Sequence, residues 1–265
     1  MIPKIIHFCW MSGDPYPPQI QRCINSWKKV LPEYEIWLWD VKRFDINSSI
    51  WVKQAYDAKK YAFCADYLRL YALYNYGGIY LDSDVEVIKS FDDLLHLPYF
   101  IGYESKKYLE AAVIGSEKQN LFLFKILQYY TNRSFRLSSG EQDLLILPKI
   151  MMQEIQGHWM INSITSIDDF DYSSNVINVF PYDWFSPIDS TGKHYVLKQT
   201  LNTYCIHHFV SAWVDWKVKL LVRVFGLNSP TRLVLQKYAK KFVLRIKRLF
   251  SYVYGCLLYT SDAAD

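Results

Sequence analysis

The feature that most constrains the fold is the run Gly77–Glu86, Gly-Gly-Ile-Tyr-Leu-Asp-Ser-Asp-Val-Glu. A glycine pair ends the preceding helical pattern, Ile79–Leu81 indicates a short buried strand, and Asp82 and Asp84 follow where that strand ends. Two carboxylates one residue apart can hold one hard divalent cation and leave positions open for substrate phosphates. The same spacing is typical of a polar turn after a strand, so alone it leaves both interpretations open.

The elements expected before this run alternate between strand and helix. Strand-like sequence at Lys4–Phe8 and Tyr34–Trp39 flanks a helical pattern at Gln19–Val30, and a long helical pattern at Lys53–Tyr76 leads to the aspartates. The order β-α-β-α-β predicts an α/β fold with a mainly parallel central sheet. Ligands of such sheets gather at the carboxyl ends of the strands. The residues that we expect there are His7, Trp10, Asp40, Asp82 and Asp84.

Length and composition fit one enzyme domain. The chain has 265 residues, of which 51% are hydrophobic, enough to bury a large core. Its five cysteines show neither a CxxC pair nor zinc spacing, which predicts reduced thiols in a cytoplasmic protein. The sequence begins without a charged-then-apolar leader and has no uncharged apolar run long enough to cross a bilayer, which favours the same location.

Basic residues are concentrated in residues 216–255. This segment has ten Lys or Arg and no Asp or Glu, whereas the whole chain has a net charge of +4. Apolar residues recur there at helical spacing, which predicts a basic amphipathic helix bound peripherally to the inner face of the plasma membrane. A terminal helix docked on the domain, with its basic face in water, is the alternative. Because the rest of the chain is acidic, we expect no nucleic-acid partner.

The last ten residues, Cys-Leu-Leu-Tyr-Thr-Ser-Asp-Ala-Ala-Asp, look like the translation of a sequencing adaptor. We therefore predict three parts: a catalytic domain at 1–215, the basic amphipathic segment at 216–255, and a non-native tail at 256–265.

A second polar pair lies on the helix expected before the aspartates. Asp66 and Arg69 are three residues apart and project from one face. They fit a surface ion pair worth about 0.2–0.5 kcal/mol. They also fit a site in which Asp66 accepts hydrogen bonds from sugar hydroxyls beside a fixed Arg69 cation. Spacing alone favours the ion pair.

Three stretches carry a resemblance to a known family. They are Ile-Pro-Lys-Ile-Ile-His-Phe-Cys-Trp at 2–10, Ala-x-Cys-Ala-Asp-Tyr-Leu-Arg-Leu-Tyr-x-Leu-Tyr-x-Tyr-Gly-Gly-Ile-Tyr-Leu-Asp-Ser-Asp-Val at 62–85, and His-His-Phe-Val-Ser-Ala-Trp at 207–213. Together they resemble the DXD-containing sugar transferases of glycosyltransferase family thirty-two. That family includes fungal initiating mannosyltransferases and bacterial capsular-polysaccharide transferases, and the glucosylating domains of large clostridial toxins are more distantly similar. The resemblance implies a GT-A fold, a single nucleotide-sugar-binding α/β domain.

The resemblance implies a role for each matching residue near the aspartates. Asp84 would bind the metal, and Asp82 would bridge metal, ribose and donor sugar. Asp66 and Arg69 match donor-sugar contacts, which reverses the preference for a surface ion pair. Trp10 matches the position of a ring over the nucleobase.

The late stretch matches a loop that closes over the diphosphate. His208 would complete the metal shell there, and Ser211 and Trp213 would hold the leaving phosphate. Related toxins have a glutamate at the position of His208. An imidazole ligand favours Mn²⁺ over Mg²⁺.

The middle of the chain adds one candidate. Glu-Gln-Asp at 141–143 resembles an acidic element that other GT-A transferases have near the donor sugar. A polar helix start with a serine cap fits it equally well. We include Asp143 among the catalytic candidates, which are Asp66, Arg69, Asp82 and Asp143.

These observations predict a metal-dependent glycosyltransferase that moves a hexose or N-acetylhexosamine from a nucleotide sugar, with retention of anomeric configuration as the resemblance implies. A UDP-sugar is favoured over GDP-mannose as donor. The expected acceptor is a glycan or lipid-linked saccharide of bacterial capsule, O-antigen or lipooligosaccharide synthesis. Two alternatives stay open: another metal-dependent nucleotide enzyme such as a nucleotidyltransferase, and a non-catalytic sugar- or calcium-binding module.

Overall fold

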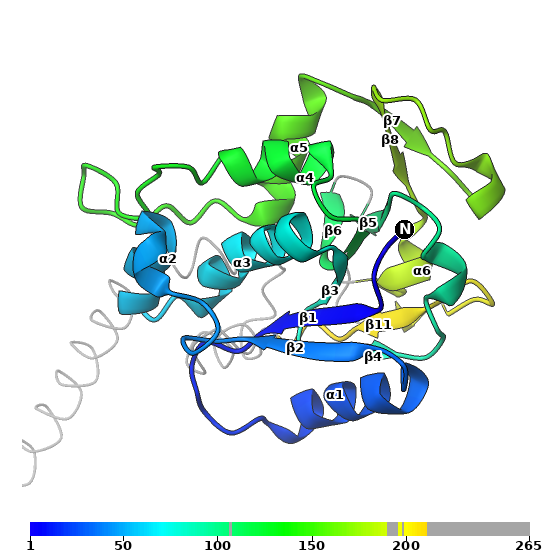
Figure 1. Cartoon of the computed structure of the whole chain (residues 1–265), viewed down its shortest axis with the longest axis horizontal. Helices are drawn as coiled ribbons and strands as arrows, with labels where there is room; N and C mark the ends of the chain where they lie inside the picture. The colour runs from blue at the N-terminus through cyan, green and yellow to red at the C-terminus, as the bar shows by residue number, and fades with distance from the viewer. Residues whose placement is uncertain (106–107, 190–195, 198, 211–265) are drawn as a thin grey trace, which may run out of the picture. The chain divides into compact units, whose positions relative to one another are not determined.

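The computed structural model describes residues 1–105, 108–189, 196–197 and 199–210, which lie within one compact unit, Met1–Asp189 with Val196–Trp213. Its centre is a five-stranded sheet in the order β2-β1-β3-β6-β5 (Figure 1). The strands of this sheet are β1 (Ile5–Cys9), β2 (Glu35–Trp39), β3 (Gly78–Leu81), β5 (Tyr99–Ser105) and β6 (Tyr108–Ser116).

The central sheet is mixed, and the prediction of a mainly parallel sheet is wrong. Strand β1 pairs parallel with β2 and with β3, as the β-α-β-α-β order predicts. Strand β6, however, pairs antiparallel with both β3 and β5. Parallel neighbours need a long crossover connection, usually a helix. The chain between β3 and β6 contains only short elements and the antiparallel partner β5, so no such crossover forms.

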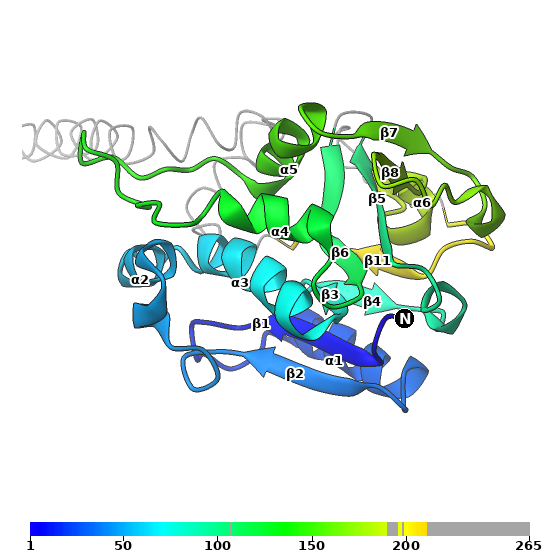
Figure 2. The same cartoon turned by 45° about the horizontal axis from the view of Figure 1, so that its top comes forward.

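Helices cover both faces of the parallel half of the sheet (Figures 1 and 2). Side chains alternate along β1: the ring of Phe8 packs edge-on against Trp27 of α1 (Pro18–Val30), with ring centroids 5.3 Å apart. On the other face, the His7 ring contacts the carbonyl of Gly77, at the end of α3 (Tyr61–Tyr76). Parallel strands covered by helices on both faces are typical of the α/β fold that the element order predicts.

The single long helix predicted at Lys53–Tyr76 is two helices, α2 (Ile50–Asp57) and α3. Ser49 caps the first by accepting a hydrogen bond from the Val52 N–H, and the chain turns where Lys59 has a φ of 56°. Left-handed backbone interrupts a helix. The spacing of apolar residues does not report the backbone conformation of a single residue, so helical periodicity alone did not locate this break. The predicted stop is confirmed: α3 ends at Gly77, whose φ is 68°.

The remaining elements surround this sheet. Strand β4 (Val85–Val87) pairs antiparallel with β11 (Cys205–His207), and β7 (Met160–Ser163) pairs parallel with β8 (Val176–Val179). The short strands β9 (Ile188–Asp189) and β10 (Val196–Leu197) pair with each other. The other helices among the described residues are α4 (Leu121–Gln128), α5 (Leu147–Gln156), α6 (Tyr182–Phe185) and the single turns Ile46–Ser48, Asp92–Leu94 and Ile167–Asp169.

Three further sequence predictions concern the carboxyl-terminal segments, membrane-spanning helices and the cysteines. The basic segment 216–255 and the tail 256–265 lie outside the described residues. Within the described residues, no helix has the length and apolar character needed to span a membrane. The four cysteines in that part of the chain, Cys9, Cys23, Cys64 and Cys205, are free thiols, as predicted.

Candidate functional site

The two aspartates lie in the turn that joins β3 to β4. Every residue of β3 is buried, and the backbone N–H of Asp82 still donates to the carbonyl of Ala112 on β6. The chain then turns, with the Val85 N–H donating to the Asp82 carbonyl. Both carboxylates therefore lie at the carboxyl end of a buried strand, which is where parallel α/β sheets bind their ligands.

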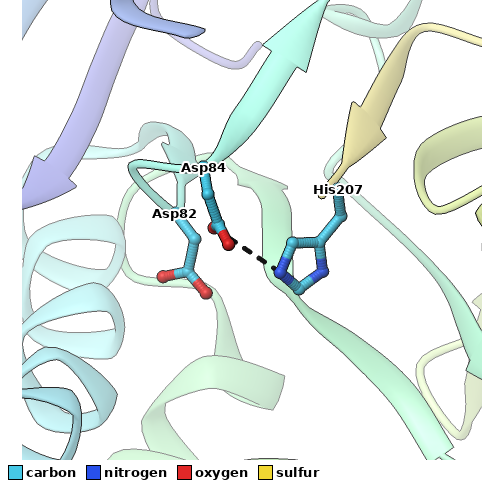
Figure 3. Close-up of side chains that lie close together, drawn as sticks. All are labelled: Asp82, Asp84 and His207. Atoms are coloured by element: carbon cyan, nitrogen blue, oxygen red, sulfur yellow. Dashed lines mark ion pairs between the residues drawn. The ribbon is translucent and has the colours of Figure 1, made fainter. Parts of the chain in front are cut away.

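A histidine from the far end of the chain completes the cluster. Strand β11 pairs with β4 in a register that sets His207 opposite Val85, directly after Asp84. Figure 3 shows the His207 ring and both aspartates pointing toward one another. One ligand atom from each of Asp82, Asp84 and His207 lies within 4.8 Å of the other two. The His207 Nε2 is 3.6 Å from Oδ1 of Asp84.

The predicted ligand His208 directly follows β11 and is not part of the Asp82–Asp84–His207 cluster. Its Nε2 contacts Glu86 at 2.8 Å, and its backbone N–H donates to the Asp84 carbonyl. Neighbouring residues in a strand point to opposite faces. The resemblance favoured the second histidine of the pair, whereas the β4–β11 register turns the first one toward the aspartates.

The cluster fits a divalent cation. Asp82 Oδ1 accepts a hydrogen bond from the Tyr80 hydroxyl at 2.9 Å, and Asp84 Oδ2 accepts one from the Val210 N–H at 2.8 Å. Each carboxylate is therefore held in place through one of its oxygens by a protein donor. Two carboxylates and one imidazole suit Mn²⁺ or Mg²⁺ together with substrate phosphates. Calcium, with six to eight oxygen ligands, fits less well.

Arg69 forms ion pairs with two aspartates, Asp66 and Asp82. Its guanidinium is 3.0 Å from Asp66 and 3.3 Å from Asp82, and the Arg69 side chain is 5% exposed. Its Nη1 donates to the Ala111 carbonyl, and its charge lies 4.6 Å from the Tyr80 ring centre. The Arg69 guanidinium, which the resemblance matches to a donor-sugar contact, is therefore already bound by two carboxylates.

Burial and neighbouring charges shift the protonation of this cluster. Burial raises the pKa of Asp66 to about 6, although Arg69 opposes the shift. Burial alone would lower the pKa of His207, but Glu110 and Asp84 outweigh it and raise that pKa to about 10. Burial, followed by repulsion from Glu110, raises the pKa of Glu104 to about 7. Perturbed groups that cluster at a strand edge are typical of functional sites.

Three more residues, Trp10, Asp40 and His7, were expected at the carboxyl ends of β1 and β2, and the structure confirms that place for only two of them. Trp10 follows that strand, donates its backbone N–H to Trp39, and packs edge-on against Tyr16 with ring centroids 5.1 Å apart. Asp40 follows β2 and accepts hydrogen bonds from two backbone N–H groups of its own turn. His7, by contrast, is fully buried within β1, so its expected place at the site is wrong.

The remaining candidates lie elsewhere. Asp143 pairs with Arg133 at 3.1 Å and accepts a hydrogen bond from the Leu145 N–H, so both of its oxygens have protein partners. Ser211 and Trp213 fall outside the described residues.

Two site residues escaped the sequence analysis. His207 was visible in the His-His pair, and strand alternation shows that only one of the two can face the aspartates, but the register that chooses between them is a tertiary property. Glu110 lies on β6, is 1% exposed and contacts His207. A charged residue in an apolar strand was the available signal, because charged side chains are rarely fully buried without a partner.

Comparisons with known proteins agree with this geometry. Residues 17–101, which contain α1, α3 and both aspartates, match the family described as "Glycosyltransferase sugar-binding region containing DXD motif". The predicted resemblance is confirmed. The region supplies both the paired aspartates and the helix that holds Asp66 and Arg69 behind them.

Two curated relatives each match about half of the chain. The "Inositol phosphoceramide mannosyltransferase 3" of Schizosaccharomyces pombe is 34% identical over 131 residues, 48% of this chain and 36% of the relative. The "Mannosyl phosphorylinositol ceramide synthase CSH1" of Saccharomyces cerevisiae is 31% identical over 140 residues, 48% of this chain and 35% of the relative. The chain thus spans little more than a third of the length of these relatives.

A solved structure, the "PaToxG Glycosyltransferase", is similar with a TM-score of 0.47 and 21% sequence identity. The match covers 59% of this chain and 68% of that structure.

Proposed function

We propose that this chain is a metal-dependent glycosyltransferase that uses a nucleotide sugar as donor. The observation that carries the proposal is the Asp82–Asp84–His207 cluster at the end of β3, within the segment that matches DXD-containing glycosyltransferases. A cation held there would neutralise charge on the departing nucleoside diphosphate, which is Lewis-acid assistance to bond cleavage.

The residues around the cluster support the same role. Arg69 fixes Asp82 from behind through a buried contact, so this carboxylate is oriented before any ligand arrives. Such preorganisation lets charges act in the reaction without rearranging first. Asp66, held by Arg69 in the same layer, is proposed to accept hydrogen bonds from donor-sugar hydroxyls. Trp10, at the neighbouring strand end, is proposed to stack on the nucleobase.

The donor sugar is proposed to be a hexose. Both relatives carry mannosyl transfer in their names, which now favours mannose, and hence GDP-mannose, over the UDP-sugars preferred from the sequence. Both names also point to lipid-borne acceptors. We therefore propose a glycan or lipid-linked acceptor, and we retain peripheral membrane attachment through residues 216–255 and bacterial cell-surface polysaccharide synthesis as parts of the proposal.

We propose transfer with retention of configuration, as the family resemblance implies. The leaving phosphate itself would help to deprotonate the acceptor hydroxyl on the same face of the sugar. Asp66 and Asp82 are both bound to Arg69, which makes them poor covalent nucleophiles. Proton NMR of the new glycosidic linkage, whose anomeric configuration is compared with that of the donor, would identify retention or inversion.

The deciding experiment measures release of nucleoside diphosphate by the full chain from GDP-mannose, UDP-glucose, UDP-galactose and UDP-N-acetylhexosamines, with Mn²⁺, Mg²⁺ or EDTA. We expect one donor to react only with a divalent cation, and Asp84→Asn to lower that rate at least about 100-fold.

Asp57→Asn is the matched control. Asp57 pairs with Lys53 on the exposed surface of α2, so we expect its loss to leave the rate within about twofold. Turnover that EDTA leaves intact, or an Asp84→Asn variant as active as the control, would overturn the proposal.

A further inference from the structure

Glu110 is a buried carboxylate that the proposed chemistry does not yet use. It lies near the start of β6 and is 1% exposed. Its Oε1 accepts a hydrogen bond from the Ala112 N–H at 2.8 Å, and its Oε2 lies 3.3 Å from Nδ1 of His207. A buried carboxylate is costly unless its oxygens are paired, and here one partner is local backbone while the other is a ring from β11.

The His207 ring lies between two carboxylates. Nδ1 faces Glu110, and Nε2 faces Asp84 at 3.6 Å. The two ring nitrogens therefore have different surroundings: one contacts a carboxylate anchored in the central sheet, and the other points into the aspartate cluster. The β4–β11 pairing holds the backbone of His207 beside Asp84 but leaves rotation of the ring to be fixed by its side-chain contacts.

We propose that Glu110 is the positioning residue of the metal centre: it holds the Nδ1–H of His207 so that the Nε2 lone pair faces the cation site. Histidine ligands generally donate their second N–H to a carboxylate or carbonyl, and this contact fixes both tautomer and ring orientation. The inference rests on the proposed metal-dependent function and adds to it a residue that would touch neither metal nor sugar.

A second pair of similar composition provides an internal comparison. His208 contacts Glu86 at 2.8 Å, but the Glu86 side chain is 44% exposed and neither residue is part of the aspartate cluster. The Glu110 side chain is 1% exposed, and its ring partner is the histidine that lies within the aspartate cluster. Water screens the first pair and not the second, so only the Glu110 contact is expected to orient a ring strongly.

The test is a calorimetric titration of the full chain with Mn²⁺ alone. We expect Glu110→Gln to weaken Mn²⁺ binding about 10–100-fold, the range found when such an outer contact is lost. Glu117→Gln is the matched control, because Glu117 directly follows the far end of β6 and contacts the chain's amino terminus. Glu117→Gln and Glu86→Gln should both stay within about twofold of the wild type.

The outcomes separate this inference from the proposed function. A wild-type chain that does not bind Mn²⁺ overturns the metal centre and the role of Glu110 with it. A wild-type chain that binds Mn²⁺ and a folded Glu110→Gln variant of equal affinity overturn only the role of Glu110. Weakening by Glu86→Gln in place of Glu110→Gln would assign the ligand to His208.

A second measurement keeps the inference testable if Glu110→Gln does not fold. The ¹⁵N chemical shifts of the His207 ring in the wild-type chain, recorded with Mg²⁺, report which nitrogen carries the proton. With the cation bound in place of the Nε2 proton, we expect a protonated Nδ1 and an unprotonated Nε2. The opposite tautomer would overturn the proposal.

Discussion

His7 is fully buried and the His207 side chain is 12% exposed, but the two rings lie in opposite surroundings. The His7 ring is within the parallel half of the sheet, where Nε2–H donates to the Gly77 carbonyl and Nδ1 accepts from the Trp39 indole. Burial lowers its pKa to about 4. His207 lies among carboxylates at the sheet edge, where Glu110 and Asp84 overcome burial and raise its pKa to about 10.

The two regions differ in the charge of the groups that contact the histidine ring. In the region of His7, every polar atom of the ring is satisfied by a neutral protein partner, and nothing is left to meet a ligand. In the region of His207, carboxylates outnumber the cations that face them, so the site attracts a positive charge. The charge of the partners, and not burial, gives the two rings their opposite pKa shifts.

The largest expected effect contrasts the two rings directly. We expect His207→Ala to lower turnover about 1,000-fold per folded molecule, because it removes a proposed cation ligand. His7→Ala should leave turnover per folded molecule within about fivefold, but should lower the free energy of unfolding by about 3 kcal/mol, through a cavity and two unsatisfied polar groups. Urea unfolding and donor turnover on the same samples measure both. Equal loss of turnover in the two variants would remove the distinction.

Arg69 tests whether the acidic site depends on its buried cation. Arg69→Leu leaves Asp66 and Asp82, whose side chains are 13% and 28% exposed, without their buried counter-charge, so we expect the free energy of unfolding to fall by about 3 kcal/mol. Arg133→Leu is the control, because the Arg133 side chain that pairs with Asp143 is 40% exposed; its loss should cost about 1 kcal/mol or less. Chemical unfolding at neutral pH compares the two, and similar losses would contradict the assignment.

The low pKa of His7 predicts a pH dependence of stability. The folded state binds a proton at His7 only near pH 4, whereas an unfolded histidine binds one near pH 6.5. Stability from this group is therefore complete above about pH 6.5 and falls by about 3 kcal/mol as pH decreases toward 4. The slope of unfolding free energy against pH should be shallower in His7→Leu than in the wild type. Identical slopes would show that His7 does not titrate as proposed.

The smallest effect concerns the glycine that admits His7. Gly78 has a φ of 106°, and a Cβ there would lie 2.6 Å from the Ile5 carbonyl and 3.0 Å from His7 Nε2. We expect Gly78→Ala to lower the unfolding free energy by about 2 kcal/mol. Gly157→Ala, where a Cβ meets nothing within 4 Å, should change it by less than about 0.5 kcal/mol. Thermal melts of both variants measure the difference, and equal melting temperatures would contradict the close approach.

Local patterns predicted most of the parallel half of the fold. The strands at β1, β2 and β3, the helix α1 and the glycine stop after α3 lie within a few residues of their predicted bounds. These elements follow from periodicity and from backbone preferences that act over a few residues. The antiparallel pairing of β6 and the break before α3 were not predicted, because they depend on connections and packing beyond that range.

The sequence by itself determined that a buried strand ends in two aspartates, and that Asp66 and Arg69 share one helical face behind them. Only the tertiary structure decided that Arg69 pairs with both Asp66 and Asp82. It also decided that His207, and not His208, faces the aspartates and contacts Glu110. The physical reason is range: residues a few positions apart are placed by local backbone geometry, whereas His207 reaches Asp84 only through the register of a strand pair more than a hundred residues apart in sequence.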